Sequence, residues 1–140
     1  MTNNTFKQYH ALVRFFESLP GRGSDYATQT ETGNRQRISN FLNLLGNPEK
    51  NLFIIHIAGT SGKGSVCTMI HEILTAAKKK NGLFTSPHLT TTLERFAVGE
   101  QLISVEDFIT CGSEVRSLIR KQKRNKLPSP TYKECMLLIA

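Results

Sequence analysis

The pattern of apolar positions changes abruptly in the middle of the chain. Phe53, Ile54, Ile55 and Ile57 form an almost continuous apolar run, which is typical of a parallel strand covered by helices on both faces. After it, apolar residues recur at helical spacing, at Val66, Met69, Ile70, Ile73, Leu74 and Ala77. The sequence therefore predicts a buried strand, a short loop and an amphipathic helix, as in an α/β domain.

The loop between this strand and this helix is rich in glycine and carries one lysine. Gly59, Gly62 and Gly64 have no Cβ, so the backbone can bring several N–H groups against an anion. Lys63 adds a full positive charge, and the helix N-terminus adds a partial one. Ser65 stands where the hydroxyl of a phosphate-binding loop would reach Mg²⁺. The stretch predicts phosphate binding, and the alternative is a glycine-rich turn that binds nothing.

Two helical stripes precede the predicted strand. They lie in residues Thr5–Leu19 and Asn34–Leu45, and both carry apolar side chains at a period of 3.6 residues. The polar stretch Ser24–Gly33 between them predicts a surface loop. Because both helices come before the first strand, we expect residues 1–48 to form a helical appendage to the rest of the domain.

A second short strand is predicted at Leu83–Thr85, after lysines 78–80 and a turn at Asn81-Gly82 end the helix. A strand, a helix and a second strand should form a right-handed parallel unit, whose ligands lie beyond the carboxyl ends of the strands. Ser86 and His88 follow the second strand. They are a candidate magnesium ligand and a candidate contact near the phosphates; the alternatives are a turn serine and a surface histidine.

The remaining third of the chain predicts further short elements. Arg95–Val98 reads as a strand that Gly99-Glu100 turns toward Leu102 and Ile103. Two capping boxes, Ser104 with Asp107 and Thr131 with Glu134, each indicate a helix start. The final residues are apolar and carry no helix stop signal, so we expect a fragment of a longer protein.

Composition narrows the class of protein without selecting one. The chain has 140 residues, a net charge of +7 and a pI near 9.6, which favours anionic partners. Cys67, Cys111 and Cys135 are far apart, so neither a disulfide framework nor a zinc site is expected. No leader and no long apolar run is present, so we expect a cytoplasmic protein that binds no membrane. The basic residues are not interleaved with aromatic ones, which argues against nucleic-acid binding.

Two stretches carry a resemblance to a known family. HIAGTSGKGSVCTMIHEILTAA and GLFTSPHLTTTLERF are similar to the N-terminal part of folylpolyglutamate synthase and dihydrofolate synthase, in the Mur ligase superfamily. The compact GTxGKGS loop of that superfamily explains why the general P-loop spacing is not met in full. TSPHL with Glu94-Arg95 resembles the folate enzymes more than the Mur-type peptidoglycan ligases. The fold implied is α/β and P-loop-containing, with a mostly parallel sheet flanked by helices.

The resemblance implies an ATP-dependent ligase that adds L-glutamate to a folate, or to dihydropteroate, through an acyl phosphate and with Mg²⁺. The resemblance implies that Ser86 is a ligand of Mg²⁺ and that Lys63 is a catalytic residue. The ATP-binding residues implied are Thr60, Ser61, Gly62, Lys63, Gly64 and Ser65, and those at the pterin pocket are Thr131, Tyr132, Lys133, Glu134 and Gly33. Residues 49–140 would form an incomplete ATP-binding domain. The chain of 140 residues would be a monomer and would not catalyse ligation by itself.

Some positions depart from the family pattern. Ser61 stands where asparagine is usual, Lys78 where glycine is frequent at the helix end, and Lys133 where an aromatic residue is usual. Two other interpretations remain open at this point. One is a non-catalytic nucleotide-binding remnant, and the other is a Mur-type ligase acting on a peptidoglycan precursor.

Overall fold

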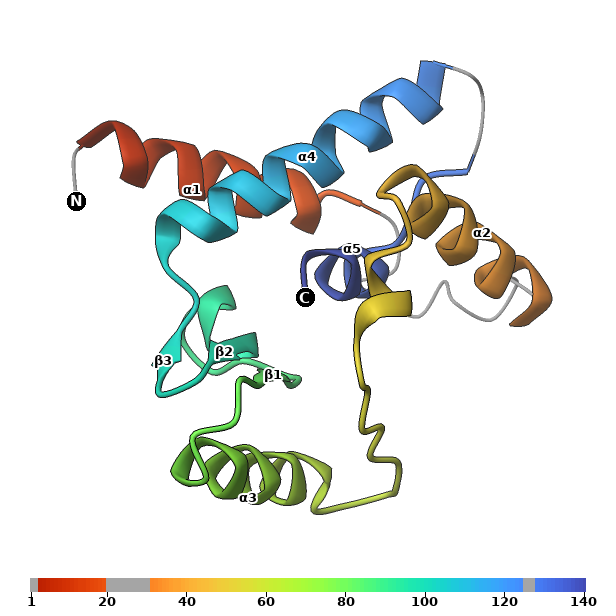
Figure 1. The fold of residues 1–140 in the computed structure, drawn as a ribbon. Helices are drawn as coiled ribbons and strands as arrows, with labels where there is room; N and C mark the ends of the chain where they lie inside the picture. The colour runs from red at the N-terminus through yellow and green to blue at the C-terminus, as the bar shows by residue number, and fades with distance from the viewer. Residues whose placement is uncertain (1–2, 20–30, 125–127) are drawn as a thin grey trace. The chain divides into compact units, whose positions relative to one another are not determined.

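The chain folds into two compact units, shown together in Figure 1. The structure is a computed structural model that describes residues 3–19, 31–124 and 128–140. Unit 1 comprises Met1–Leu52 and Phe108–Ala140, and unit 2 comprises Phe53–Asp107. The expected boundary after residue 48 lies close to the end of the first of these segments. The last 33 residues (108–140), however, group with the N-terminal helices instead of with the phosphate loop.

Unit 1 is helical. Its elements are α1 (Asn3–Glu17), α2 (Glu31–Leu44), the short 3₁₀ helix η2 (Pro48–Asn51), most of α4 (Val105–Arg124) and α5 (Tyr132–Ile139). Both N-terminal helices are thus confirmed, and so are the helices that the capping boxes predicted. Among the described residues, no helix combines the length and the apolar content needed to cross a membrane.

Helix α2 begins earlier than the sequence indicated. Its first residue is Glu31, so Gly33 lies in the first turn of a helix and the prediction of a loop there was wrong. Residues 24–30 of the predicted loop lie outside the described ranges. Within the predicted part of the helix, Arg37 Nη2 donates to Asn34 Oδ1 over 2.7 Å, and such i, i+3 pairs support a helical turn.

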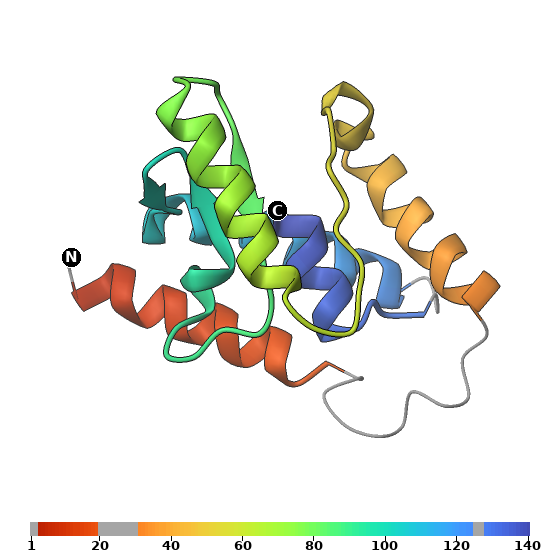
Figure 2. The same cartoon turned by 90° about the horizontal axis from the view of Figure 1, so that it is seen from below.

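The core of unit 1 is formed where α1 and α4 lie side by side (Figures 1 and 2). The two helices approach closely at Gly112, because a Cβ added there would lie 2.6 Å from Leu12 Cδ2 and 3.3 Å from Phe16 Cε2. Buried side chains from four helices surround this contact: Leu12, Phe16, Phe41, Phe108, Val115, Ile119, Tyr132, Cys135, Met136 and Ile139. The N-terminal helix therefore contributes buried side chains to the core of unit 1.

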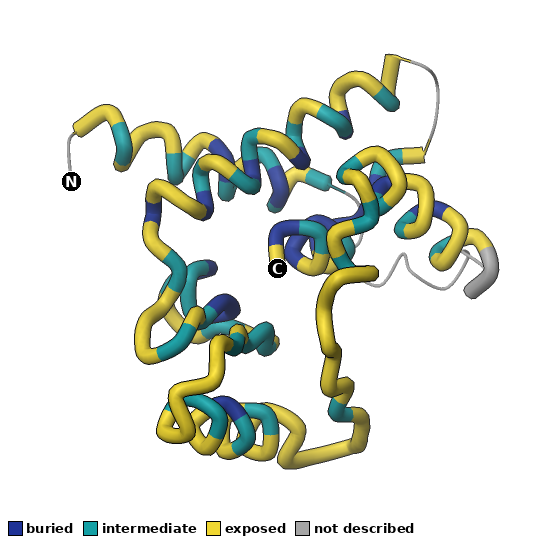
Figure 3. The backbone as a smooth tube through the Cα atoms, viewed as in Figure 1, coloured by how far each residue is buried: buried dark blue, intermediate teal, exposed yellow. Residues whose placement is uncertain are grey.

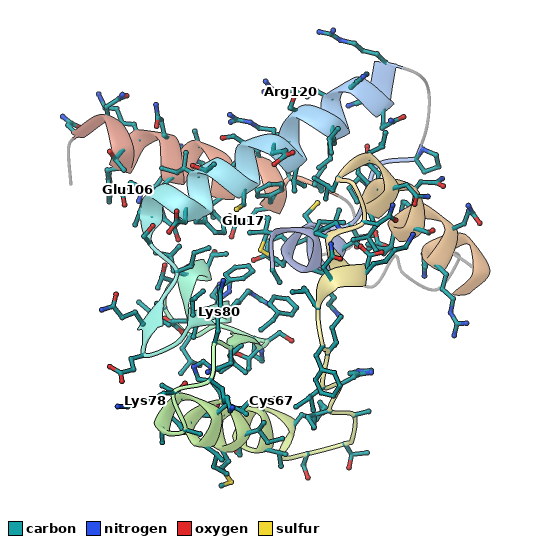
Figure 4. All side chains as sticks on the ribbon, in the orientation of Figure 1. Glu17, Cys67, Lys78, Lys80, Glu106 and Arg120 are labelled. Carbon is teal, nitrogen blue, oxygen red and sulfur yellow. The ribbon has the colours of Figure 1, made fainter. Side chains whose placement is uncertain are left out.

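Aromatic rings extend the contact between α1 and α4. The rings of Tyr9 and Phe108 meet edge to face with their centroids 5.5 Å apart. Near the other end of α4, the guanidinium carbon of Arg120, labelled in Figure 4, lies 5.6 Å from the centre of the Phe15 ring. One residue of the basic run at the end of α4 thus lies over an aromatic ring, although both Arg120 and Lys121 are exposed.

Unit 2 contains helix α3 (Lys63–Ala76) and a small sheet of β1 (Gly82–Phe84), β2 (Phe96–Val98) and β3 (Gln101–Leu102). A 3₁₀ turn, η3 (Thr92–Arg95), precedes β2. The sheet has the order β1-β2-β3 and is antiparallel throughout, with Phe84 opposite Phe96 and Val98 opposite Gln101. The strands β1 and β2 were predicted, whereas the residues of β3 were predicted only to follow a turn. The parallel pairing predicted between the run at 53–57 and the strand at 83–85 is not found among the described residues, where β1 pairs with β2 alone.

The apolar run before the phosphate loop forms no strand in this structure. Residues 53–57 are extended but hydrogen-bond to no other strand among the described residues. Phe53 is 96% exposed, Ile54 65% and Ile55 50%, and Figure 3 shows residues 53–56 as exposed, followed by Ile57 with intermediate burial. A parallel strand is buried only when neighbouring strands and helices cover it, and the three antiparallel strands of unit 2 do not.

Helix α3 ends at a left-handed residue that is not glycine. Lys78, at the end of α3 in Figure 4, has φ 54°, and its amide donates to Thr75 O over 2.9 Å. The amide of Lys79 donates to Leu74 O over 2.9 Å, which completes a Schellman motif. The predicted closure at Asn81-Gly82 was therefore misplaced by several residues.

Replacing Lys78 with glycine should stabilise the protein by about 0.5–1 kcal/mol, because a Cβ is unfavourable at positive φ. Lys80→Gly is the matched control: Lys80 is exposed and does not have a positive φ, so glycine there only increases the freedom of the unfolded chain. Urea unfolding of both variants would measure the difference. A loss of stability in Lys78→Gly would contradict the assignment of strain to this residue.

Candidate functional site

The predicted phosphate loop has the backbone shape that its glycines allow. Gly62 is the residue before α3 and has φ 73°, and Gly59 also has a positive φ of 157°. A Cβ added to Gly62 would meet nothing within 4 Å, so its conformation and not crowding requires glycine. Gly64 differs from the expectation, since it lies inside the first turn of α3 with ordinary helical geometry.

Lys63 is the first residue of α3, and its side chain turns back over the loop. Its Nζ donates to Gly59 O over 2.6 Å and to Thr60 O over 3.2 Å. The first amide with a backbone acceptor at this helix start is that of Val66, which donates to Gly62 O over 3.0 Å. Within the part of the chain that the structure describes, the amides from Thr60 to Ser65 have no protein acceptor.

This arrangement suits an anion. An exposed ammonium group, a set of amides without protein acceptors and the positive end of a 14-residue helix all occur within seven residues (59–65). Residues 60–65 are all exposed, so their side chains and backbone are open to a ligand. The structure thus brings together the residues that the sequence assigned to a triphosphate.

Ser86, the predicted magnesium ligand, lies on an exposed loop after β1 and precedes a cis peptide bond to Pro87. Within the described residues, no group of three or more His, Cys, Asp or Glu side chains is placed to hold a metal ion. His88, on the same loop, accepts a hydrogen bond at Nδ1 from Arg95 Nε over 2.8 Å. A neutral His88 ring therefore carries its proton on Nε2.

Glu94 supports this loop in a way that the sequence analysis missed. Its carboxylate accepts from the backbone amides of Leu89, Thr90 and Thr91 over 2.8, 2.9 and 2.8 Å. Thr91 and Glu94 also form a capping box at the start of η3, and the Thr-x-x-Glu spacing was the sequence signal that could have found it. Glu94 and Arg95 together hold the segment that follows Ser86.

These contacts make the loop sensitive to acid. The hydrogen bonds from the Leu89 and Thr91 amides hold the pKa of Glu94 below its ordinary value near 4.5. A lowered pKa in the folded state means that the stabilisation is complete above the ordinary value and is lost as the pH falls through the lowered one.

The difference in Tm between the wild type and Glu94→Gln should therefore be constant from neutral pH down to about pH 4.5 and should shrink at lower pH. Thermal unfolding followed by circular dichroism over a pH series measures it. Glu100→Gln, at an exposed turn residue of the same unit, is the control for a change of net charge. A Tm difference for Glu94→Gln that does not vary with pH would contradict the role given to the carboxylate.

The predicted pterin-pocket residues lie at the start of α5 and are mostly occupied by protein contacts. Thr131 and Glu134 form the predicted capping box: Thr131 N donates to Glu134 Oε2 over 2.7 Å, and Glu134 N donates to Thr131 Oγ1 over 3.3 Å. Thr131 is 2% exposed and Tyr132 6%, whereas Lys133 is exposed. Gly33, predicted at the same pocket, is exposed on α2.

The next residue of α5 is a buried thiol with a structural role. Cys135 is fully buried, and burial raises the pKa of its thiol to about 12, with the charge of Glu134 acting in the same direction. The thiol therefore stays protonated at neutral pH and is no nucleophile. This agrees with the absence of any cysteine from the predicted site.

Known proteins with similar sequences are enzymes of folate metabolism. No protein-family model matches the chain. The chain is 39% identical over 83 residues to dihydrofolate synthase/folylpolyglutamate synthase of Mycobacterium tuberculosis, covering 59% of this chain and 17% of that protein. It is 34% identical over 117 residues to a folylpolyglutamate synthase of Arabidopsis thaliana, covering 81% of this chain and 20% of that protein.

The fold is similar to that of solved synthases. The folylpolyglutamate synthase of Thermotoga maritima superposes with a TM-score of 0.82 and 30% identity, over 96% of this chain and 30% of that one. The chain spans about a fifth of the curated relatives and about a third of this solved structure. By sequence and by fold, the chain is a homologue of the folylpolyglutamate and dihydrofolate synthases over the part of those proteins that it spans.

Proposed function

We propose that this chain binds ATP at residues 59–65 and takes part in the ATP-dependent ligation of L-glutamate to a folate or to dihydropteroate. The observation that supports the proposal is the loop before α3, in which an exposed ammonium group lies over a loop whose amides have no acceptor among the described residues. A solved folylpolyglutamate synthase complex with AMPPCP and folate, similar over 94% of this chain with a TM-score of 0.82, supports both ligand classes.

The chemistry explains why a phosphate loop is needed. A carboxylate resists attack by an amine, so its oxygen first takes the γ-phosphoryl group of ATP, and ADP leaves. The amine of glutamate then attacks the acyl carbon, phosphate leaves and an amide forms. In such transfers a protein contributes mainly positioning and neutralisation of charge. On binding of ATP, Lys63 Nζ would donate to phosphate oxygens instead of to its present acceptors, Gly59 O and Thr60 O. The backbone amides of Thr60–Gly64 would also donate to the phosphates.

The hydroxyl groups of Ser65 and Ser86 would serve Mg²⁺. This ion prefers oxygen ligands, keeps several waters and is often held largely by the phosphates of a nucleotide. The donors of unit 2 fit such a site, because both hydroxyls are exposed and no cluster of acidic residues among the described positions would hold the ion without a nucleotide. The ion would neutralise charge on the transferring phosphoryl group.

The folate or dihydropteroate would lie against unit 1, near Gly33 and the start of α5. Lys133 is the exposed member of the predicted group at α5, so it offers the most direct contact with a ligand. Thr131 and Tyr132 are buried and would contribute by shaping the position of Lys133. The relatives are enzymes named for folate chemistry, which favours this substrate class over a peptidoglycan precursor.

Two measurements test the proposal. Calorimetry should detect binding of AMPPCP and of folate to the purified chain, and the absence of both would refute it. An assay with ATP, folate and radiolabelled glutamate tests catalysis. Because the chain spans 30% of the Thermotoga maritima synthase, we expect the 140 residues alone to bind nucleotide without forming the amide.

A further inference from the structure

The residues proposed to meet the folate lie on two helices of unit 1 that are far apart in the sequence. Gly33 is in the first turn of α2, and Thr131–Glu134 open α5. An ion pair between residues 97 positions apart joins these two helices, from Arg37 on α2 to Glu134 on α5.

The geometry of this pair is bidentate. Arg37 Nε donates to Glu134 Oε2 over 3.0 Å, and Nη2 donates to Oε1 over 2.8 Å. The side chains are only 9% and 13% exposed, so water competes little for either charge. Nη2 also donates to Asn34 Oδ1 over 2.7 Å, which ties the pair to the residue directly after Gly33.

Glu134 also contacts the backbone at the start of α5. The oxygen that accepts from Arg37 Nε, Oε2, also accepts from the Thr131 amide over 2.7 Å. Arg37 therefore fixes a carboxylate that in turn fixes the first turn of α5, where the exposed Lys133 lies. Both oxygens of Glu134 are used in these contacts, so this side chain acts as a link within the protein.

We propose that Arg37 is a positioning residue for the folate or dihydropteroate, and that it acts through Glu134 to hold the α2 and α5 parts of the pocket in register. This inference rests on the proposed function, and it changes the role of Glu134 from a ligand contact to a support. A lysine could not replace Arg37, because the contact to both carboxylate oxygens and to Asn34 needs the planar fork of a guanidinium group.

The test compares Arg37→Lys with the matched control Arg35→Lys. Both arginines lie on α2, but Arg35 is exposed while Arg37 is 8% exposed. Equilibrium dialysis with radiolabelled folate should give a Kd about tenfold or more higher for Arg37→Lys, because the two parts of the pocket lose their register. The Kd for AMPPCP, whose proposed site is in unit 2, should stay at the wild-type value in both variants.

Each other result would overturn the proposal in a recognisable way. Wild-type affinity for folate in Arg37→Lys would remove the positioning role while leaving the proposed function intact. A parallel loss of folate and AMPPCP binding, with a lower helical signal in circular dichroism, would show that Arg37 only maintains the fold. A wild-type chain that binds AMPPCP but no folate would refute the substrate class, and the positioning role with it.

Discussion

Replacing Lys63 with alanine is expected to weaken AMPPCP binding by on the order of a hundredfold, because a charged hydrogen-bond donor to the phosphates is removed. In the structure this ammonium group is held 2.6 Å from Gly59 O and 3.2 Å from Thr60 O, directly over the loop. It can therefore reach a bound phosphate without any change in the backbone. The substitution leaves the fold intact, since the side chain is exposed and a helix start accepts alanine.

The control for this experiment is Lys79→Ala, which removes the same charge from an exposed position of unit 2 after the end of α3. Isothermal titration calorimetry at one ionic strength compares the variants, because salt screens the general attraction between a basic protein and a nucleotide. We expect Lys79→Ala to bind like the wild type. Equal affinities of Lys63→Ala and the wild type would rule out Lys63 as a phosphate contact.

Replacing Phe16 with alanine should lower the free energy of unfolding by about 3–5 kcal/mol, the usual result of emptying a fully buried aromatic position. Phe16 is 0% exposed, and its ring lies against the position where α4 has Gly112. This prediction follows from the structure alone. If α1 belonged to a separate appendage, as its place in the sequence suggested, the loss of one of its side chains would change the free energy of unfolding of the rest of the protein little.

Phe6→Ala provides the same substitution on the same helix at a position that is 56% exposed. The Phe6 and His10 rings meet edge to face with their centroids 4.2 Å apart. We therefore expect the free energy of unfolding to fall by less than about 1 kcal/mol. Guanidinium unfolding followed by circular dichroism would compare the two variants. Similar losses for Phe6→Ala and Phe16→Ala would contradict the placement of α1 in the core of unit 1.

The features predicted correctly from the sequence depend on residues close together in the chain. Ser104 caps the start of α4 as predicted, since Asp107 N donates to Ser104 Oγ over 2.9 Å, and the Thr131–Glu134 capping box is present. The turn at Gly99, with φ 57°, was also predicted, and so was a helix that follows the glycine-rich loop, although α3 already begins at Lys63. Capping and positive φ are local requirements, so one short segment contains the whole signal.

The features that could not be predicted depend on contacts between distant segments. No sequence motif links Arg37 with Glu134, because the two residues are 97 positions apart and meet only where α2 packs against α5. The parallel pairing predicted between residues 53–57 and 83–85 is not found among the described residues for a similar reason. A period of apolar residues indicates a strand but does not say which strand will pair with it, or in which direction.

The exposed run Phe53–Ile57 has a consequence for the behaviour of the protein at high concentration. It combines aromatic and β-branched side chains, contains no proline and leaves its peptide groups without a strand partner among the described residues. Such a segment is a template on which extended chains from other molecules can add. Crowded preparations of this chain will therefore tend toward intermolecular cross-β assembly that starts here, immediately next to the loop proposed to bind ATP.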